Sequence, residues 1–109
     1  METIEEFKCA QDDQNVEWSF NGRLIKKTFP CNIFAECFKE RDAVVVVLRS
    51  NDFAPNNAVV LNADGTEKTT VVNPVDKNKK PVFSDVYYSG DKLNLIITES
   101  TAQHKCVVD

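Results

Sequence analysis

Short runs of alternating apolar and polar residues, separated by turn residues, dominate the chain, and this pattern is typical of β-strands. The clearest turns are Asn21-Gly22 and Asp64-Gly65, because a type I′ hairpin turn needs residues that tolerate positive φ at both central positions. Ser89-Gly90-Asp91 is a third turn. The longest clean apolar run, residues 43–48, has the size of a strand and is too short to cross a bilayer. We therefore predict a mainly β, antiparallel protein.

Aligning Gly22 with Gly65 reveals an internal repeat of about 45 residues. Each copy contains a strand before the glycine turn, a strand after it, an aromatic strand that follows a proline, and a strongly apolar strand. The repeat units cover approximately residues 16–57 and 58–109 of a single domain, residues 1–109. They predict two repeated four-stranded antiparallel meanders, each like a propeller blade, packed together. The segment 105–109 resembles the start of a third copy and would pair with an exposed sheet edge.

Two segments also fit helices. Residues 32–40 have apolar side chains at helical spacing behind Asn32, a good helix cap, so local periodicity favours a helix. The repeat favours a strand there, and both readings stay open for residues 32–41. Residues 3–6 match a capping box, which predicts a short N-terminal helix.

The net charge of −4 is concentrated near the N-terminus. Residues 1–20 contain six acidic residues and one basic residue, whereas residues 21–109 contain eleven acidic and twelve basic residues. Direct nucleic-acid binding needs a basic surface, so this distribution argues against it. An acidic segment suits a basic protein partner, because complementary charge speeds association.

The acidic start of the chain lacks the basic residues and apolar core of a signal peptide, so we expect a cytoplasmic protein with no membrane association. Thiols stay reduced in the cytosol, and the cysteines are then expected to pack as small apolar residues. They are Cys9, Cys31, Cys37 and Cys106. With no Cys-x-x-Cys pair and His104 as the single histidine, we expect no metal site and no cofactor.

Motifs of catalysis are missing from the sequence. His104 has no evident orienting partner, and no serine lies in a Gly-x-Ser-x-Gly context. A cysteine nucleophile paired with His104 has nothing in the sequence to support it. We therefore expect no catalytic residues and a protein that is not an enzyme.

Binding is expected to use acidic residues of the N-terminal segment together with charged and aromatic residues of the loops and strands. Trp18 shares a strand face with Val16 and Phe20, so we expect it to pack in the core. Phe53 is the only apolar aromatic in a polar loop, and one of Tyr87 and Tyr88 should face outward. The candidate partner-binding residues are Asp12, Asp13, Glu17, Asp52, Phe53 and Tyr87.

In its acidic N-terminal segment, its hairpins at Asn21-Gly22 and Asp64-Gly65 and its lack of a signal peptide, the chain resembles the small immunity proteins that bacteria carry against toxins of contact-dependent growth inhibition and related systems. The resemblance is one of type, because no diagnostic motif is present. It implies a cognate protein toxin, often a basic nuclease, whose active site is covered by a monomer or small oligomer. The alternatives are a β-repeat scaffold that self-assembles, or a small-ligand-binding protein or enzyme with a pocket between the two units.

Overall fold

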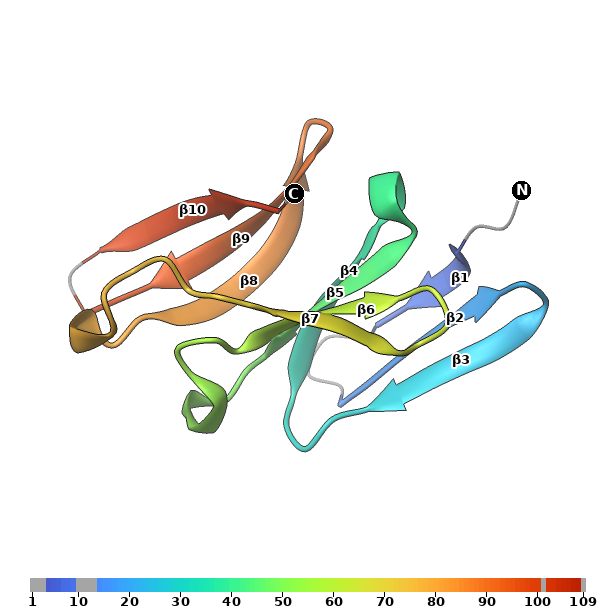
Figure 1. Ribbon diagram of the computed structural model, residues 1–109, viewed down its shortest axis with the longest axis horizontal. Coiled ribbons are helices and arrows are strands. Elements are labelled where there is room, and N and C mark those ends of the chain that lie inside the picture. The colour runs from blue at the N-terminus through green and yellow to red at the C-terminus, as the bar shows by residue number, and fades with distance from the viewer. Residues whose placement is uncertain (1–3, 10–13, 101, 109) are drawn as a thin grey trace.

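The computed structural model describes residues 4–9, 14–100 and 102–108, and these residues form ten strands in three antiparallel sheets (Figure 1). The first sheet contains β1 (Ile4–Lys8), β2 (Asn15–Phe20) and β3 (Arg23–Thr28). The second contains β4 (Ile33–Phe38), β5 (Ala43–Leu48), β6 (Ala58–Asn62) and β7 (Glu67–Val71). The third contains β8 (Val82–Ser89), β9 (Lys92–Thr98) and β10 (Gln103–Val107). Three short 3-10 turns lie in the connections: η1 (Lys39–Arg41), η2 (Asn51–Phe53) and η3 (Lys77–Lys79).

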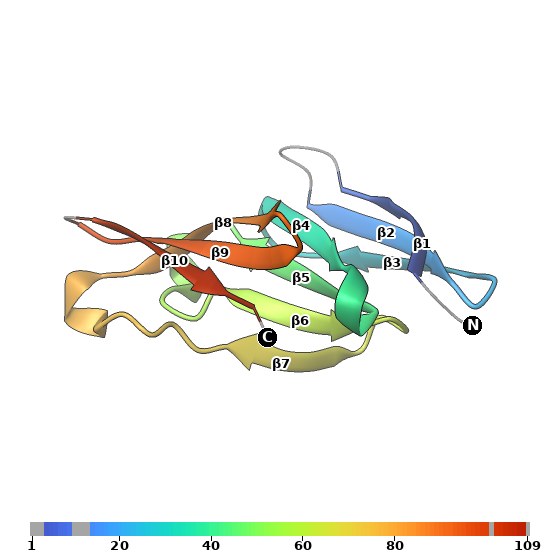
Figure 2. The same cartoon turned by 90° about the horizontal axis from the view of Figure 1, so that it is seen from above.

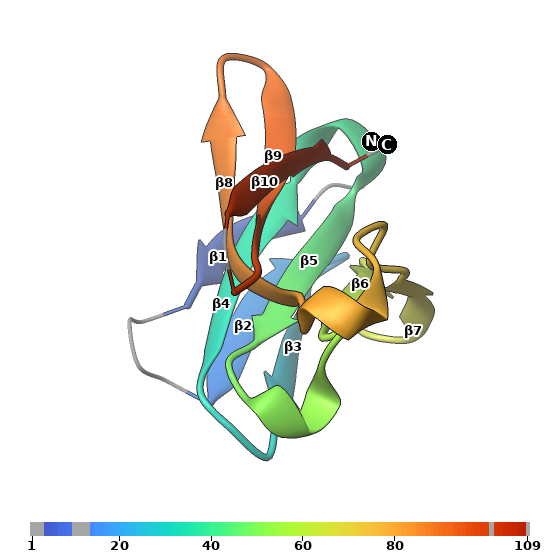
Figure 3. The same ribbon diagram turned by 90° about the vertical axis from the view of Figure 1, so that its left-hand side faces the viewer.

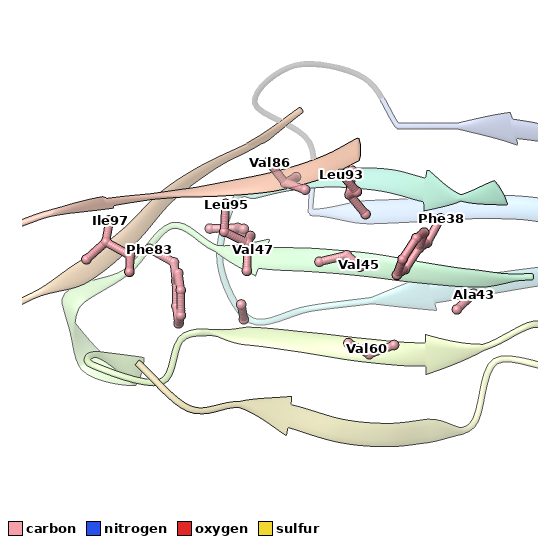
Figure 4. Close-up of a cluster of buried hydrophobic side chains, with 11 residues drawn as sticks. Phe38, Ala43, Val45, Val47, Val60, Phe83, Val86, Leu93, Leu95 and Ile97 are labelled. Atoms are coloured by element: carbon pink, nitrogen blue, oxygen red, sulfur yellow. The ribbon is translucent and has the colours of Figure 1, made fainter. Parts of the chain in front are cut away.

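The second sheet lies between the other two, so both faces of its strand β5 are covered (Figures 1 and 2). Its contact with the third sheet forms a larger cluster, made of Phe38, Ala43, Val45, Val47, Ala58, Val60, Phe83, Val86, Leu93, Leu95 and Ile97 (Figure 4). Its contact with the first sheet forms a smaller cluster, made of Val16, Trp18, Ile33, Val44, Val46, Leu48 and Leu61. We call them the third-sheet cluster and the first-sheet cluster.

The position of β5 between the two clusters explains why its sequence is an unbroken apolar run. Successive side chains of a strand point to opposite faces of the sheet. Residues 43, 45 and 47 belong to the third-sheet cluster, and residues 44, 46 and 48 belong to the first-sheet cluster. Because every position of β5 is buried, the alternation seen in half-exposed strands is absent.

The predicted antiparallel β character is confirmed, but the strands group differently from the two four-stranded units that we expected. Hairpin β6–β7, expected to open the second unit, pairs with β5 and completes the second sheet. The expected boundary between residues 57 and 58 therefore falls inside a sheet. The chain passes between sheets near Pro30, Pro74 and Pro81 instead, since proline lacks the N–H that continued strand pairing needs.

The local expectations have mixed outcomes. Residues 33–38 form a strand, so the repeat indicated the right structure where helical periodicity did not. Residues 4–8 form β1, so the N-terminal helix was wrong over the described residues, and Thr3 lies outside them. Ile4 and Phe7 pack against the first-sheet cluster while β1 pairs with β2, and this tertiary contact outweighs a local capping signal.

Both glycine hairpins form, with different turns. Asn21 and Gly22 both have positive φ, 54° and 76°, as a type I′ turn requires. In the second hairpin only Gly65 is left-handed, with φ of 91°, and the loop is wider, so the predicted type I′ turn was wrong. The Asp64 side chain accepts hydrogen bonds from the backbone N–H and the hydroxyl of Thr66, which explains its place in this wider turn. These bonds lower the pKa of the exposed Asp64 carboxyl.

Candidate functional site

Two polar loops, residues 51–57 and 73–81, lie at the same edge of the molecule (Figure 3). The buried side chain of Asn57 holds them to the sheets. Its Nδ2 donates hydrogen bonds to the carbonyls of Leu48 and Phe83 at 2.8 and 2.7 Å. Its Oδ1 accepts one from the Phe83 N–H at 2.8 Å. The Asn57 side chain thus forms the hydrogen bonds that a neighbouring strand would form, and it links the second sheet to the start of β8.

Asn73 links the two loops directly. Its backbone N–H donates to Oδ1 of Asn56 at 2.8 Å, and its Nδ2 donates to the carbonyl of Pro55 at 2.9 Å. Its Oδ1 accepts a hydrogen bond from the backbone N–H of Val75 at 3.1 Å. Asn73 is itself buried, so these bonds are shielded from water. The loops therefore form one braced surface.

A groove of about 370 Å³ lies between these loops. Its apolar side is formed by Ala54, Pro55, Pro81 and Val82. Its polar side carries Asn51 and the cationic side chains Lys77 and Lys80. A groove with an apolar floor and a few charged groups at its rim suits a protruding side chain or short segment of another molecule.

Phe53 and Asp52 stand beside this groove, in η2. The turn is closed because the hydroxyl of Ser50 accepts a hydrogen bond from the Asp52 N–H at 3.2 Å. The side chain of Phe53 is 40% exposed. Asp52 also lies near Cys31: burial raises the pKa of the Cys31 thiol, the Asp52 carboxylate raises it further, and a backbone hydrogen bond from Arg49 opposes both. Cys31 therefore stays a protonated thiol, and none of the four cysteines is in a disulfide.

Of the four predicted binding residues that the structure describes, it brings together Asp52 and Phe53, which are neighbours in η2. Glu17 lies on β2, in register with Lys26 of β3 and Lys8 of β1, so its negative charge has basic neighbours on both sides. Tyr87 lies near the far end of β8, away from the loops that meet Val82 at its start. Asp12 and Asp13 lie outside the described residues.

The two adjacent tyrosines divide as expected of neighbours in a strand. Tyr88 faces inward and packs against the third-sheet cluster. Its hydroxyl donates a hydrogen bond to the carbonyl of Cys37 and accepts one from the backbone N–H of Lys39, both at 2.9 Å. Tyr87 is on the outer face of the third sheet, in register with Asn94.

Sequence reasoning missed the pairing of His104 with Glu99. Nε2 of His104 lies 2.9 Å from Oε2 of Glu99, whose side chain is only 2% exposed. The two residues flank the turn between β9 and β10, which the Glu99 N–H closes by donating to the carbonyl of Ala102. This turn has no glycine or proline, so only the recognition of residues 93–107 as a hairpin would have placed the pair together.

Within the described parts of the chain, no group of three or more His, Cys, Asp or Glu residues is placed to hold a metal ion. In the same residues no helix has the length and apolar character needed to span a membrane. The sequence matches no protein-family model, no curated protein and no solved structure.

Proposed function

We propose that this protein is an inhibitor of the immunity type, which binds a cognate toxin and covers its active site. The observation that carries the proposal is Phe53, an aromatic side chain that is exposed on a braced loop whose neighbouring residues Asn51 and Ala54 line a groove. Aromatic residues contribute a large share of the binding energy at protein interfaces. A braced loop also loses little conformational entropy when a partner docks.

Charge supports a partner surface of mixed polarity with a basic component. Asp52, beside Phe53, offers a carboxylate to a basic group, and Lys77 and Lys80 across the groove suit an acidic one. The acidic segment that contains Asp12, Asp13 and Glu17 would act mainly by steering a basic, nuclease-type toxin toward this surface. Electrostatic steering depends on charge near the docking surface and does not require direct contact between the two proteins. It can therefore operate even though lysines lie beside Glu17.

The first test is binding to the product of the adjacent gene. The two proteins should co-purify, and Phe53→Ala should weaken the complex by roughly tenfold or more, as truncation of an interface hot spot does. The control is Leu24→Ala, which removes another exposed apolar side chain, 70% exposed, from β3 of the first sheet. Absence of a complex, or equal affinity of both variants, would count against the proposal.

A second test concerns steering. Asp12→Asn, Asp13→Asn and Glu17→Gln together should slow association and flatten its dependence on ionic strength, while dissociation stays nearly unchanged. Stopped-flow measurements over a salt series separate these rates. An unchanged association rate and salt slope would remove the acidic segment from the docking process.

The second candidate is self-assembly, and the outer face of the third sheet favours it. One row across this face reads Asp85, Ile96, Lys105, because Ile96 of β9 is in register with both flanking residues. A second copy turned by a two-fold rotation about the direction of β9 would place its Lys105 against Asp85 and its Ile96 against Ile96. The row is therefore self-complementary.

Charge exchange distinguishes this candidate from the inhibitor. If the face forms a homodimer, Asp85→Lys or Lys105→Asp alone should dissociate it, and the two together should restore it. Sedimentation velocity of the four forms measures this directly. A monomeric native protein would remove the candidate and leave the inhibitor proposal unaffected.

A further inference from the structure

Strand β10 is an open edge of the third sheet, because its only strand partner among the described residues is β9. All of its residues, Gln103–Val107, keep their register with β9 without interruption. The edge strands β1, β7 and β8 each contain a register shift. Such a shift bends a strand and disrupts pairing at its edge, whereas a regular edge can accept a further strand.

Backbone hydrogen bonds show which groups of β10 point away from β9. The Glu99 N–H donates to the Ala102 carbonyl, and the Val108 N–H donates to the Leu93 carbonyl. Bonded and non-bonded pairs alternate along an antiparallel ladder, so every second residue between these two points also bonds to β9. The N–H and C=O groups of residues 103, 105 and 107 therefore face outward.

These outward groups are available to a further strand. In the part of the chain that the structure describes, their one partner is the Cys106 thiol, whose Sγ lies 3.8 Å from the carbonyl oxygen of Val107. Gln103, Lys105 and Val107 are themselves exposed. Unpaired N–H and C=O groups along an exposed strand edge are a template for pairing with another chain.

A cavity of about 460 Å³ adjoins this edge, between loop 73–81 and strands β9 and β10. Its apolar lining includes Val75 from the loop, Ile97 from β9 and Cys106 from β10. Lys105 also lines the cavity, although its side chain lies on the opposite face of the sheet, so the cavity reaches the backbone edge of β10. A strand added to β10 would place every second side chain in this cavity.

The carboxylates of the cavity already have partners. Oε2 of Glu99 lies 2.9 Å from Nε2 of His104. Asp76 caps η3, where its Oδ1 accepts a hydrogen bond from the Asn78 N–H at 2.9 Å. Lys79 is the remaining charged residue of the lining apart from Lys105, and it is exposed. The apolar part of the cavity therefore suits uncharged, apolar side chains.

The opposite face of the same edge has a different character. Alternation along β9 and β10 places Lys92 and Lys105 on this outer face, and neither strand contains an acidic residue. The cross-strand neighbour of Lys105 in β9 is the apolar Ile96. An acidic side chain directly opposite Lys105 on an added strand would form a favourable cross-strand pair.

We propose that β10 binds an extended segment of another protein, which joins the third sheet as an additional antiparallel strand. Apolar side chains of the segment enter the cavity beside Val75 and Cys106, and an acidic side chain on its other face lies opposite Lys105. Main-chain hydrogen bonds supply affinity in this mode of recognition, and alternate side chains supply specificity. Phe53 is not among the residues that line this cavity, so the site can be tested without the partner that docks there.

Titration of the ¹⁵N-labelled protein with a short blocked peptide of alternating valine and glutamate tests the proposal. Amide exchange should slow at Gln103, Lys105 and Val107, whose N–H groups gain partners, and should change much less at His104 and Cys106. A peptide with lysine in place of each glutamate should bind at least roughly fivefold more weakly, because it places like charges opposite Lys105.

Methylation of the peptide nitrogens identifies the bonded edge of the peptide. Residues directly opposite each other in an antiparallel pair have side chains on the same face, so the glutamate N–H groups should face β10. N-methylation of the glutamates should abolish binding, whereas N-methylation of the valines should preserve most of it. Equal losses from the two modifications would show that the peptide does not add as an antiparallel strand.

Variants of the protein test the two faces separately. Lys105→Glu should reverse the preference, so that the lysine peptide binds more tightly than the glutamate peptide. Val75→Asp should weaken binding of the glutamate peptide by roughly fivefold or more, because it places a carboxylate beside the valines. The matched control is Val72→Asp, at a position that is 73% exposed just beyond β7, and it should leave the affinity nearly unchanged.

The amide spectrum of each variant reports whether the fold is kept. Absence of saturable binding, equal affinity of the two peptides for the native protein, or an unchanged preference in Lys105→Glu would each overturn the proposal.

Discussion

The two outer sheets are attached to the central sheet in different ways. The first sheet is attached by apolar side chains, of which Trp18 is the largest: it is fully buried, and its Nε1 donates a hydrogen bond to the carbonyl of Ala63 at 2.7 Å. The third sheet combines the larger apolar cluster with polar links, in which Asn57 pairs with the Phe83 backbone and Tyr88 reaches the Cys37 carbonyl. One interface centres on a single large residue, and the other adds several polar links to its apolar contacts.

This difference predicts where local changes matter. Apolar packing has little directionality. The attachment of the first sheet therefore depends on the volume of Trp18 and on how well this side chain fits the loop that it contacts. Hydrogen bonds in a buried setting are directional, so the third sheet also depends on the position of a few donors and acceptors. Four substitutions test this contrast.

Trp18→Ala should have the largest effect, a loss of about 4 kcal/mol in the free energy of unfolding, because truncation of a buried tryptophan leaves a large cavity. Urea denaturation measures the loss. Hydrogen exchange should show that amides of β2 and β3 lose protection before those of β9. Trp18→Phe keeps most of the volume and removes the donor to Ala63, so its loss should be about half as large or less. Equal losses in both variants would contradict a role for packing.

Asn57→Ala should cost about 3 kcal/mol, because the backbone donor and acceptor of Phe83 and the Leu48 carbonyl all lose their partner in a buried setting. The matched control is Asn78→Ala, an exposed asparagine in η3 that donates its backbone N–H to Asp76. Thermal and urea unfolding of both variants give the comparison. A loss similar to that of the control would mean that Asn57 contributes little to the attachment of the third sheet.

Gly65→Ala should cost about 2 kcal/mol, partly from a left-handed backbone and partly from a clash. An added Cβ would lie 2.8 Å from Cγ2 of Ile25 on β3, where the loop approaches the first sheet. Gly22→Ala has the same kind of backbone, and its Cβ would meet nothing within 4 Å. Its cost should therefore be about 1 kcal/mol. Ile25→Ala removes Cγ2, so Gly65→Ala in that background should cost about as little as Gly22→Ala, and an unchanged cost would show that the clash with Ile25 contributes nothing.

Glu36→Gln should have the smallest effect, visible only in the dependence of stability on pH. Burial chiefly raises the pKa of Glu36; Lys39 lowers it, and Asp85 of the third sheet raises it. A carboxyl whose pKa is raised in the folded state binds its proton more tightly there. The free energy of unfolding therefore falls as pH rises from the ordinary value of 4.5 through the raised one.

Urea unfolding at a series of pH values tests this sign. The native protein and Glu36→Gln should have similar stability below pH 4.5, where the carboxyl is protonated in both states. Above the raised pKa of Glu36, the Glu36→Gln variant should be more stable than the native protein. Curves that stay parallel throughout would show that Glu36 ionises equally well in both states.

The surface formed by loops 51–57 and 73–81 could be predicted only in part from the sequence. Phe53 could be singled out because an apolar aromatic in a polar loop is unusual, and the structure places it beside a groove. The groove itself depends on Asn57 and Asn73, whose side chains find partners far along the chain. Nothing in the local sequence distinguishes these two asparagines from the others in the same loops. The pair of Glu99 and His104 was hidden for the same reason, because an ordinary-looking turn brings them together.

The sequence by itself determined several of the strands and the glycine turns between them. The apolar run of β5, the alternation in β2 and the Asn21-Gly22 turn are local, since side-chain direction and permitted φ angles depend on adjacent residues. The tertiary structure alone decided which hairpins share a sheet and which side chains meet across layers. Hairpin β6–β7 carries no local mark that assigns it to β5, because any strand edge offers the same N–H and C=O groups. Its place follows from the simultaneous burial of both faces of β5, a property of the whole folded chain.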